Sequence, residues 1–88
     1  MKLVSVGRLL KEAYLEPSGM SLNTLAKQLE VSPSTLSRVL TDKSVLTVDM
    51  AIKLEKVWPR KAYTWLNHQV KHQLQEVGYD IKITNVSV

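Results

Sequence analysis

Two short amphipathic helices, joined by a break of about three residues, constrain the fold of this chain more than any other feature of its sequence. The first spans residues 21–29, with Ser21 placed to cap it, and the second spans residues 33–41, with Ser32 as its cap and Pro33 at its first position. One face of each is apolar at helical spacing, through Leu22, Leu25, Ala26 and Leu29 in the first and Leu36, Val39 and Leu40 in the second. Two helices so closely connected have the layout of a helix-turn-helix.

The outer face of the second helix carries short hydroxyl side chains and a single long cation. Its outward positions are Ser32, Ser34, Thr35, Ser37, Arg38 and Thr41. In a DNA major groove, hydroxyl groups can donate hydrogen bonds to phosphates or base acceptors, and Arg38 can bind a guanine edge with two hydrogen bonds. Taken without its neighbours, this helix is equally consistent with an ordinary solvated surface and with a DNA-binding surface. Joined to the helix-turn-helix layout, it predicts a DNA recognition helix.

Three more segments have helical periodicity, so the sequence predicts an all-α fold of five helices. Residues 5–17 form the first helix, which we expect to end at Pro17. Residues 47–57 form the fourth helix. Residues 60–77 form the fifth and longest, which ends at Gly78.

The C-terminal tail, residues 79–88, changes from the helical period to the alternation of a strand. Tyr79, Ile81 and Ile83 alternate there with polar residues. We therefore divide the chain into a helix-turn-helix domain at 1–78 and a short C-terminal β-like extension at 79–88. Because a single strand leaves its backbone groups unpaired, we expect the extension to pair with the same tail of a second chain or with the sheet edge of a partner protein.

Composition limits the functions that the chain can have. Its 88 residues leave room for one small domain, and they contain no Ser-His-acid set and no Gly-rich phosphate loop, so an enzyme is the least favoured class. The absence of cysteine excludes disulfides, and no apolar stretch approaches the roughly 20 residues of a membrane span. A net charge of +4 fits a polyanionic partner without requiring one. We expect a cytoplasmic protein with no cofactor, metal, membrane partner or small-molecule substrate.

Several motifs of this chain occur together in one known family of DNA-binding proteins. They are "LEP" followed by a small turn and "MS", then "LA", "VSPSTLSRVL", "LT", "MAIKLEKV" and "YTWLNHQ", all within residues 5–75. In this combination the chain resembles the HigA-type antitoxins of the phage-repressor-like (XRE/Cro) helix-turn-helix family. The resemblance implies a five-helix, lambda-repressor-like domain that binds operator DNA as a homodimer and represses its own operon. It also implies a toxin partner, a RelE/HigB-like mRNA interferase that the protein neutralises.

The resemblance also implies which residues contact DNA. Base contacts fall to Ser32, Ser34, Thr35, Ser37 and Arg38. Phosphate contacts fall to Ser21, Asn23, Lys43, Ser44 and Thr47, some of which stand at helix starts, where free N–H groups favour phosphate.

Two turns depart from the family pattern. Glu30 and Asp42 stand where the family has glycine, and a positive φ at such a residue introduces about 1 kcal/mol of strain, which Asp tolerates better than Glu. Ser44 replaces a family arginine, which removes a phosphate-binding cation. We therefore expect weaker non-specific DNA affinity or a reduced operator role.

The fifth helix has a longer apolar stripe than a small domain needs to bury. Antiparallel pairing of this helix in a homodimer would set two recognition helices about one DNA turn, roughly 34 Å, apart. The predicted dimer residues are Leu66, Val70, Leu74, Tyr79, Ile81 and Ile83.

Three other groups of side chains have both a functional and an ordinary interpretation. One face of the fifth helix carries His68, His72 and Glu76, which lack the further ligands of a zinc site, so we interpret them as solvated. The junction of the last two helices carries Trp58, Tyr63 and Trp65, which we expect in the core or the dimer contact. A basic run comprises Lys53, Lys56, Arg60 and Lys61. Its charge density does not separate a solvated face from contacts to the DNA backbone or the toxin.

Two alternatives to the antitoxin function remain open from the residues. The chain fits a stand-alone phage-type repressor that has no toxin. It also fits a helix-turn-helix module that binds proteins and has lost DNA binding, which the missing turn glycines would favour. A neighbouring toxin gene would favour the antitoxin over the stand-alone repressor. Salt-dependent DNA binding would exclude a module that has lost DNA binding.

Overall fold

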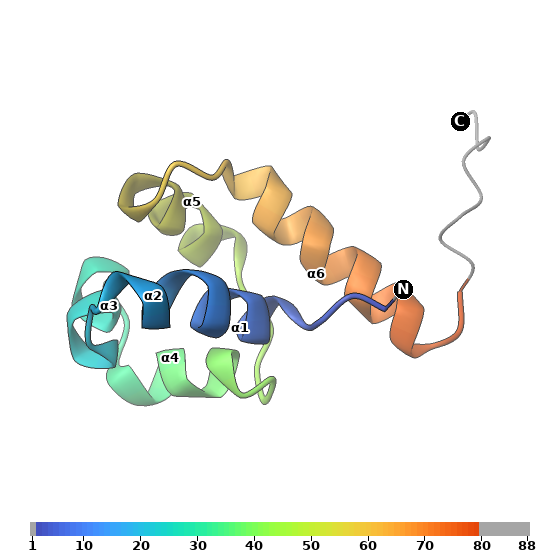
Figure 1. Cartoon of the computed structure of the whole chain (residues 1–88), viewed down its shortest axis with the longest axis horizontal. Helices are drawn as coiled ribbons and strands as arrows, with labels where there is room; N and C mark the ends of the chain where they lie inside the picture. The colour runs from blue at the N-terminus through green and yellow to red at the C-terminus, as the bar shows by residue number, and fades with distance from the viewer. Residues whose placement is uncertain (1, 80–88) are drawn as a thin grey trace.

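The structure is a computed structural model that describes residues 2–79 (Figure 1). Its regular elements are α1 (Val6–Leu9), η1 (Leu10–Leu15), α2 (Glu16–Ser18), α3 (Leu22–Gln28), α4 (Pro33–Leu40), α5 (Val48–Val57) and α6 (Ala62–Glu76). Because α1, η1 and α2 follow one another without a break, they form one N-terminal helix, and the predicted all-α fold of five helices is confirmed. No described helix is both long and apolar enough to span a membrane.

The predicted C-terminal strand lies outside the described residues, except for its first residue. Tyr79 is not part of a strand, and its N–H donates to the carbonyl of Leu74 at 2.9 Å, so it closes the end of α6. The division of the chain at residue 78 stays a prediction.

The prediction that the N-terminal helix ends at Pro17 is wrong, because the helix continues to Ser18. A proline inside a helix lacks a donor, and its ring crowds the carbonyl four residues earlier. Here η1 has the wider π-helical turn, in which the Glu16 N–H donates to the carbonyl of Lys11. Pro17 therefore lies at the start of a new turn, α2, and the helix ends at Gly19, where φ is 75°.

The core lies where the N-terminal helix, the α3–α4 pair and the α5–α6 pair meet. In Figure 1, α1 and α2 run between α4 on one side and α5 and α6 on the other, and α1 packs against both α4 and α6. The most buried apolar side chains are Leu10, Leu25, Ala26, Leu29, Leu36, Val39, Leu46, Ala51, Leu54 and Trp65. Burying one leucine contributes about 1.5–3 kcal/mol, so this set is the main source of stability.

A glycine allows α1 to approach the C-terminal end of α4 at backbone distance. A Cβ atom at Gly7 would overlap the carbonyl oxygen of Val39 and lie 2.9 Å from Oδ1 of Asp42. Only hydrogen fits there, so Gly7 sets how closely the N-terminal helix supports the predicted recognition helix.

Two of the three aromatic residues expected in the core or the dimer contact pack around Tyr14. Its ring centroid lies 4.8 Å from that of the fully buried Trp65 and 5.5 Å from that of Trp58. The guanidinium of Arg60 stacks on the Trp65 ring at 4.7 Å. Tyr63, in contrast, is 64% exposed and takes no part in this cluster.

Candidate nucleic-acid interface

The predicted recognition helix, α4, begins as its sequence dictates. Ser32 has an extended backbone, and its Oγ accepts a hydrogen bond from the Thr35 N–H at 3.1 Å, which satisfies one unpaired donor of the first turn. Pro33 occupies the first turn, as predicted. Leu36 and Val39 are buried, so this side of the helix is held against the core.

The opposite side of α4 presents small polar groups and one cation. Ser32, Ser34, Thr35 and Arg38 are exposed, and Ser37 is half-buried. The hydroxyl oxygens of Ser32 and Thr35 lie 2.9 Å apart, so the capping hydrogen bonds also orient this pair. Residues 31–41 contain no acidic side chain, so no negative charge on this helix opposes a phosphate backbone.

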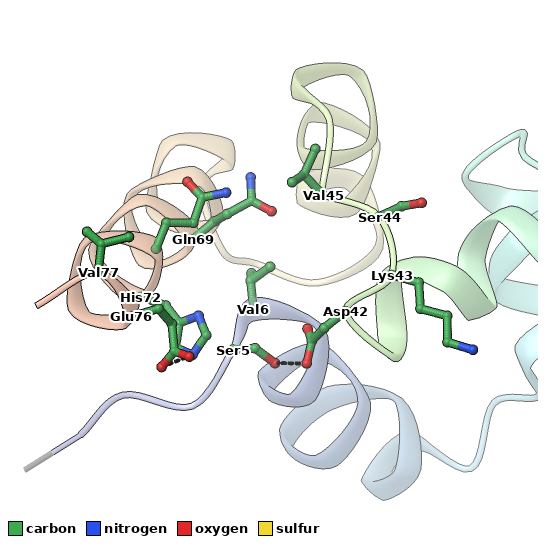
Figure 2. Close-up of a pocket in the computed structure, with 11 residues that line it drawn as sticks. Ser5, Val6, Asp42, Lys43, Ser44, Val45, Gln69, His72, Glu76 and Val77 are labelled. Atoms are coloured by element: carbon green, nitrogen blue, oxygen red, sulfur yellow. Dashed lines mark hydrogen bonds and ion pairs between the residues drawn. The ribbon is translucent and has the colours of Figure 1, made fainter.

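The turn after α4 folds back and brings Ser44 beside Arg38. Arg38 Nε donates to Ser44 Oγ at 3.4 Å. The Arg38 carbonyl accepts hydrogen bonds from the N–H groups of Lys43 at 2.8 Å and Ser44 at 3.1 Å. Lys43 is exposed, and Figure 2 shows its side chain pointing away from α6. Two cations and a hydroxyl therefore lie together at the C-terminal end of α4.

The remaining predicted phosphate contacts lie at the starts of the neighbouring helices. Ser21 caps α3 by accepting from the Thr24 N–H at 3.1 Å, and Thr47 caps α5 by accepting from the Met50 N–H at 3.2 Å. Both caps are exposed, as is Asn23 in the first turn of α3. The structure thus places every predicted DNA-contacting residue at the surface, with only Ser37 half-buried.

Both residues that replace turn glycines have the left-handed backbone that glycine favours. The angle φ is 59° at Glu30 and 64° at Asp42. Each side chain makes a contact that glycine cannot make. Lys53 Nζ donates to Glu30 Oε1 at 3.3 Å, and Ser5 Oγ donates to Asp42 Oδ2 at 2.7 Å (Figure 2). The first contact joins the helix-turn-helix turn to α5, and the second joins the end of α4 to the start of α1.

A family profile described as helix-turn-helix (HTH_3) matches residues 10–58, which is more than half of the chain and includes α3, α4 and α5. The chain belongs to this helix-turn-helix family. Virulence-associated protein I of Dichelobacter nodosus is 33% identical over 88 residues, which cover 100% of this chain and 82% of the relative. Antitoxin HigA-1 of Vibrio cholerae is 39% identical over 66 residues, which cover 75% of this chain and 62% of the relative.

A solved structure of similar fold contains promoter DNA. It is the Pseudomonas aeruginosa antitoxin HigA with the higBA promoter, with a TM-score of 0.79 and 26% identity over 86% of this chain and 83% of that one. The resemblance of this helix-turn-helix chain to HigA-type antitoxins is thereby confirmed. None of these three relatives is named for a catalytic activity.

The predicted dimer residues of this helix-turn-helix domain divide between its core and its surface. Leu66 is half-buried and packs against the core, and Leu74 is also half-buried. Val70 is 49% exposed and Tyr79 is 50% exposed. Ile81 and Ile83 lie outside the described residues. The stripe on α6 therefore serves the domain's own core in part, and its C-terminal half offers apolar surface.

The histidines of α6 have partners within the domain. Nε2 of His68 lies 2.7 Å from the carbonyl oxygen of Val4, and Nε2 of His72 lies 3.7 Å from Oε2 of Glu76. Within residues 2–79, no three His, Asp or Glu side chains gather as a metal site would require.

Most of the basic run is engaged by neighbouring side chains. Lys53 Nζ lies 3.0 Å from Asp49 Oδ2, and this hydrogen bond raises the pKa of Lys53 above its usual 10.5. Lys61 Nζ lies 3.8 Å from Glu55 Oε2, and Arg60 stacks on the core as described above. These contacts favour a structural role for the run over a separate docking site.

Sequence reasoning missed two side chains that hydrogen-bond to the segments carrying the predicted DNA contacts. The first is Ser5, whose hydroxyl donates to the Asp42 carboxylate. Gln69 on α6 accepts a hydrogen bond from the Leu46 N–H at 2.7 Å and donates one to the Leu46 carbonyl at 2.9 Å. The local pattern around Gln69 contains no sign of the loop that it contacts, because that loop lies far away in the chain.

Proposed function

We propose that this chain binds operator DNA with α4 in the major groove. The observation that carries the proposal is the exposed face of α4, which combines hydroxyl groups with one arginine and lacks acidic side chains. Its base-contacting residues are Ser32, Ser34, Thr35, Ser37 and Arg38. Membership of the helix-turn-helix family supports the proposal, as does the related antitoxin with promoter DNA.

Each part of the interface has a distinct role in this proposal. Nε of Arg38 is directed to Ser44, which leaves the two terminal guanidinium nitrogens for O6 and N7 of a guanine, a contact that contributes about 1–3 kcal/mol of discrimination. Phosphates are bound by Lys43 and Ser44 beside α4 and by Ser21, Asn23 and Thr47 at the flanking helix starts. These contacts orient α4 in the groove, whereas the face of α4 reads the bases.

We further propose that the DNA-bound form is a homodimer. The apolar surface of Val70 on α6 and of Tyr79 just beyond the end of α6 supports it, since both side chains are about half exposed. A two-fold pair places its two recognition helices about one DNA turn, roughly 34 Å, apart, so the operator is expected to contain two related half-sites.

A gel-shift titration at two salt concentrations tests DNA binding. With at least one lysine–phosphate contact in each protomer, operator affinity is expected to fall by about tenfold or more between 50 and 200 mM salt. The bound species should contain two chains per operator, as measured by its mass. A shuffled duplex of equal length and composition is the control for specificity. Absent binding, or binding that salt does not change, would contradict the proposal and favour a protein-binding module.

We propose that the protein also neutralises a RelE/HigB-like toxin, on the strength of its similarity to HigA antitoxins. Expression of the adjacent gene product is then expected to arrest growth, and co-expression of this chain should restore it. The Arg38→Ala variant should restore growth equally well if toxin binding and DNA reading use different surfaces. A chain with no adjacent toxin gene and no effect on growth arrest would instead be a stand-alone repressor.

A further inference from the structure

One side chain of α6, that of Gln69, makes two hydrogen bonds to the backbone of the loop between α4 and α5. Gln69 uses both ends of its amide on one residue, Leu46. Its Oε1 accepts from the Leu46 N–H at 2.7 Å, and its Nε2 donates to the Leu46 carbonyl at 2.9 Å. Figure 2 shows Gln69 on α6 facing this loop at the position of Val45.

The loop has few other internal attachments between its ends. Its start is closed by the hydrogen bonds to the Arg38 carbonyl, and its end is the Thr47 cap of α5. Between them, Val45 is 59% exposed, and Leu46 turns its side chain into the core, where it is 2% exposed. The backbone at Leu46 is therefore positioned by its buried side chain on one side and, relative to α6, by the two amide hydrogen bonds of Gln69.

This backbone position matters because the same loop carries proposed DNA contacts on its outer side. Lys43, Ser44 and Thr47 all lie within four residues of Leu46 and are exposed. A shift of the backbone at Leu46 would move them relative to Arg38, whose side chain already contacts Ser44.

We propose that Gln69 is a positioning residue for DNA binding, which acts through Leu46 to set the loop of phosphate contacts against α4. The inference rests on the proposed function. A neutral amide suits this role because it donates and accepts at once. An alanine at this position would leave both backbone groups of Leu46 without their partner.

The chain contains a matched control on the same helix. Gln75 makes the same pair of hydrogen bonds with Leu3, accepting from its N–H at 2.9 Å and donating to its carbonyl at 3.0 Å. Leu3 belongs to the N-terminal segment, which carries no proposed DNA contact. Gln69→Ala and Gln75→Ala therefore each remove two side-chain hydrogen bonds to a backbone from the same helix. They differ in the segment that loses these bonds, which is the α4–α5 loop for Gln69 and the N-terminal segment for Gln75.

The experiment compares operator affinity, its salt dependence and thermal stability for the wild type and both variants. Both variants should lower Tm by similar amounts. Gln69→Ala should weaken operator binding about tenfold and reduce the salt slope by about one per protomer, as expected when a lysine–phosphate contact is lost. Gln75→Ala should change affinity by less than about twofold and leave the slope unchanged, because it touches no DNA-contacting segment. Hydrogen exchange at the Leu46 amide should quicken only in Gln69→Ala.

Two outcomes would overturn the inference in distinguishable ways. Equal losses of affinity in the two variants, or an unchanged salt slope in Gln69→Ala, would show that Gln69 only stabilises the fold. Failure of the wild type to bind operator DNA would overturn the proposed function, and this inference with it.

Discussion

Replacing Arg38 with alanine is expected to abolish specific operator binding and to leave the fold intact. One bidentate arginine–guanine contact contributes about 1–3 kcal/mol, so its loss from both protomers of a dimer removes about 2–6 kcal/mol, or a factor of roughly 30 to more than 10⁴ in affinity. The folded domain depends little on this side chain, since Arg38 is exposed and its side-chain hydrogen bond is the 3.4 Å contact to Ser44. Fluorescence anisotropy with labelled operator measures the loss, and circular dichroism checks the fold.

Arg8→Ala is the matched control for this experiment. Arg8 is an exposed arginine on α1 that pairs with Glu12 at 3.0 Å, and its removal changes the net charge by the same amount. It should leave operator affinity within about twofold, because it lies outside the proposed contacts. Arg38→Lys should keep most of the non-specific affinity and lose discrimination, since lysine cannot make the two-point contact. Full affinity in Arg38→Ala, or equal losses in Arg8→Ala, would contradict base reading by Arg38.

The Gly7→Ala substitution is expected to be the most destabilising small change in the domain. Inside a helix, alanine is normally favoured over glycine by about 1 kcal/mol. Here the added Cβ would overlap the Val39 carbonyl and crowd Asp42, so α1 must move away from α4. We expect a net loss of about 3 kcal/mol or more, since backbone atoms on both sides cannot yield as a flexible side chain can. For a domain of this size, Tm should fall by roughly 12 °C or more.

Gly19→Ala separates this clash from the general effect of removing a glycine. No atom lies within 4 Å of a Cβ placed at Gly19, where φ is 75°. That variant should lose only about 1 kcal/mol, from the left-handed backbone alone. Thermal unfolding of the two variants under identical conditions makes the comparison. Equal stability of Gly7→Ala and the wild type would mean that α1 and α4 are not in backbone contact.

The features of the interface that the sequence predicted correctly depend on residues a few positions apart. Ser32 caps α4 because its Oγ reaches the N–H of Thr35, and Thr47 caps α5 in the same way. The spacing of Leu36 and Val39 determines which side of α4 is buried, and therefore which side carries the hydroxyls and Arg38. The positive φ at Glu30 and Asp42 was expected from the family resemblance, because the family has glycine at both positions.

Only the tertiary structure showed what holds this interface in place. From the sequence alone, Gly7 is an ordinary helix glycine, and only the structure shows that α4 packs against it. Pro17 is a typical helix end in the sequence, but the π-helical hydrogen bonds of η1 allow the helix to continue past it. Gln69 and Leu46 are 23 positions apart, and Ser5 and Asp42 are 37 apart, so no local pattern connects them. By itself, the sequence determined the helices, most of their caps and the polar face of α4 that we propose contacts DNA, since propensity, capping and periodicity act within a few residues. The tertiary structure decided how α1 and α6 support that face, since such contacts depend on which distant backbone groups the packed helices bring together.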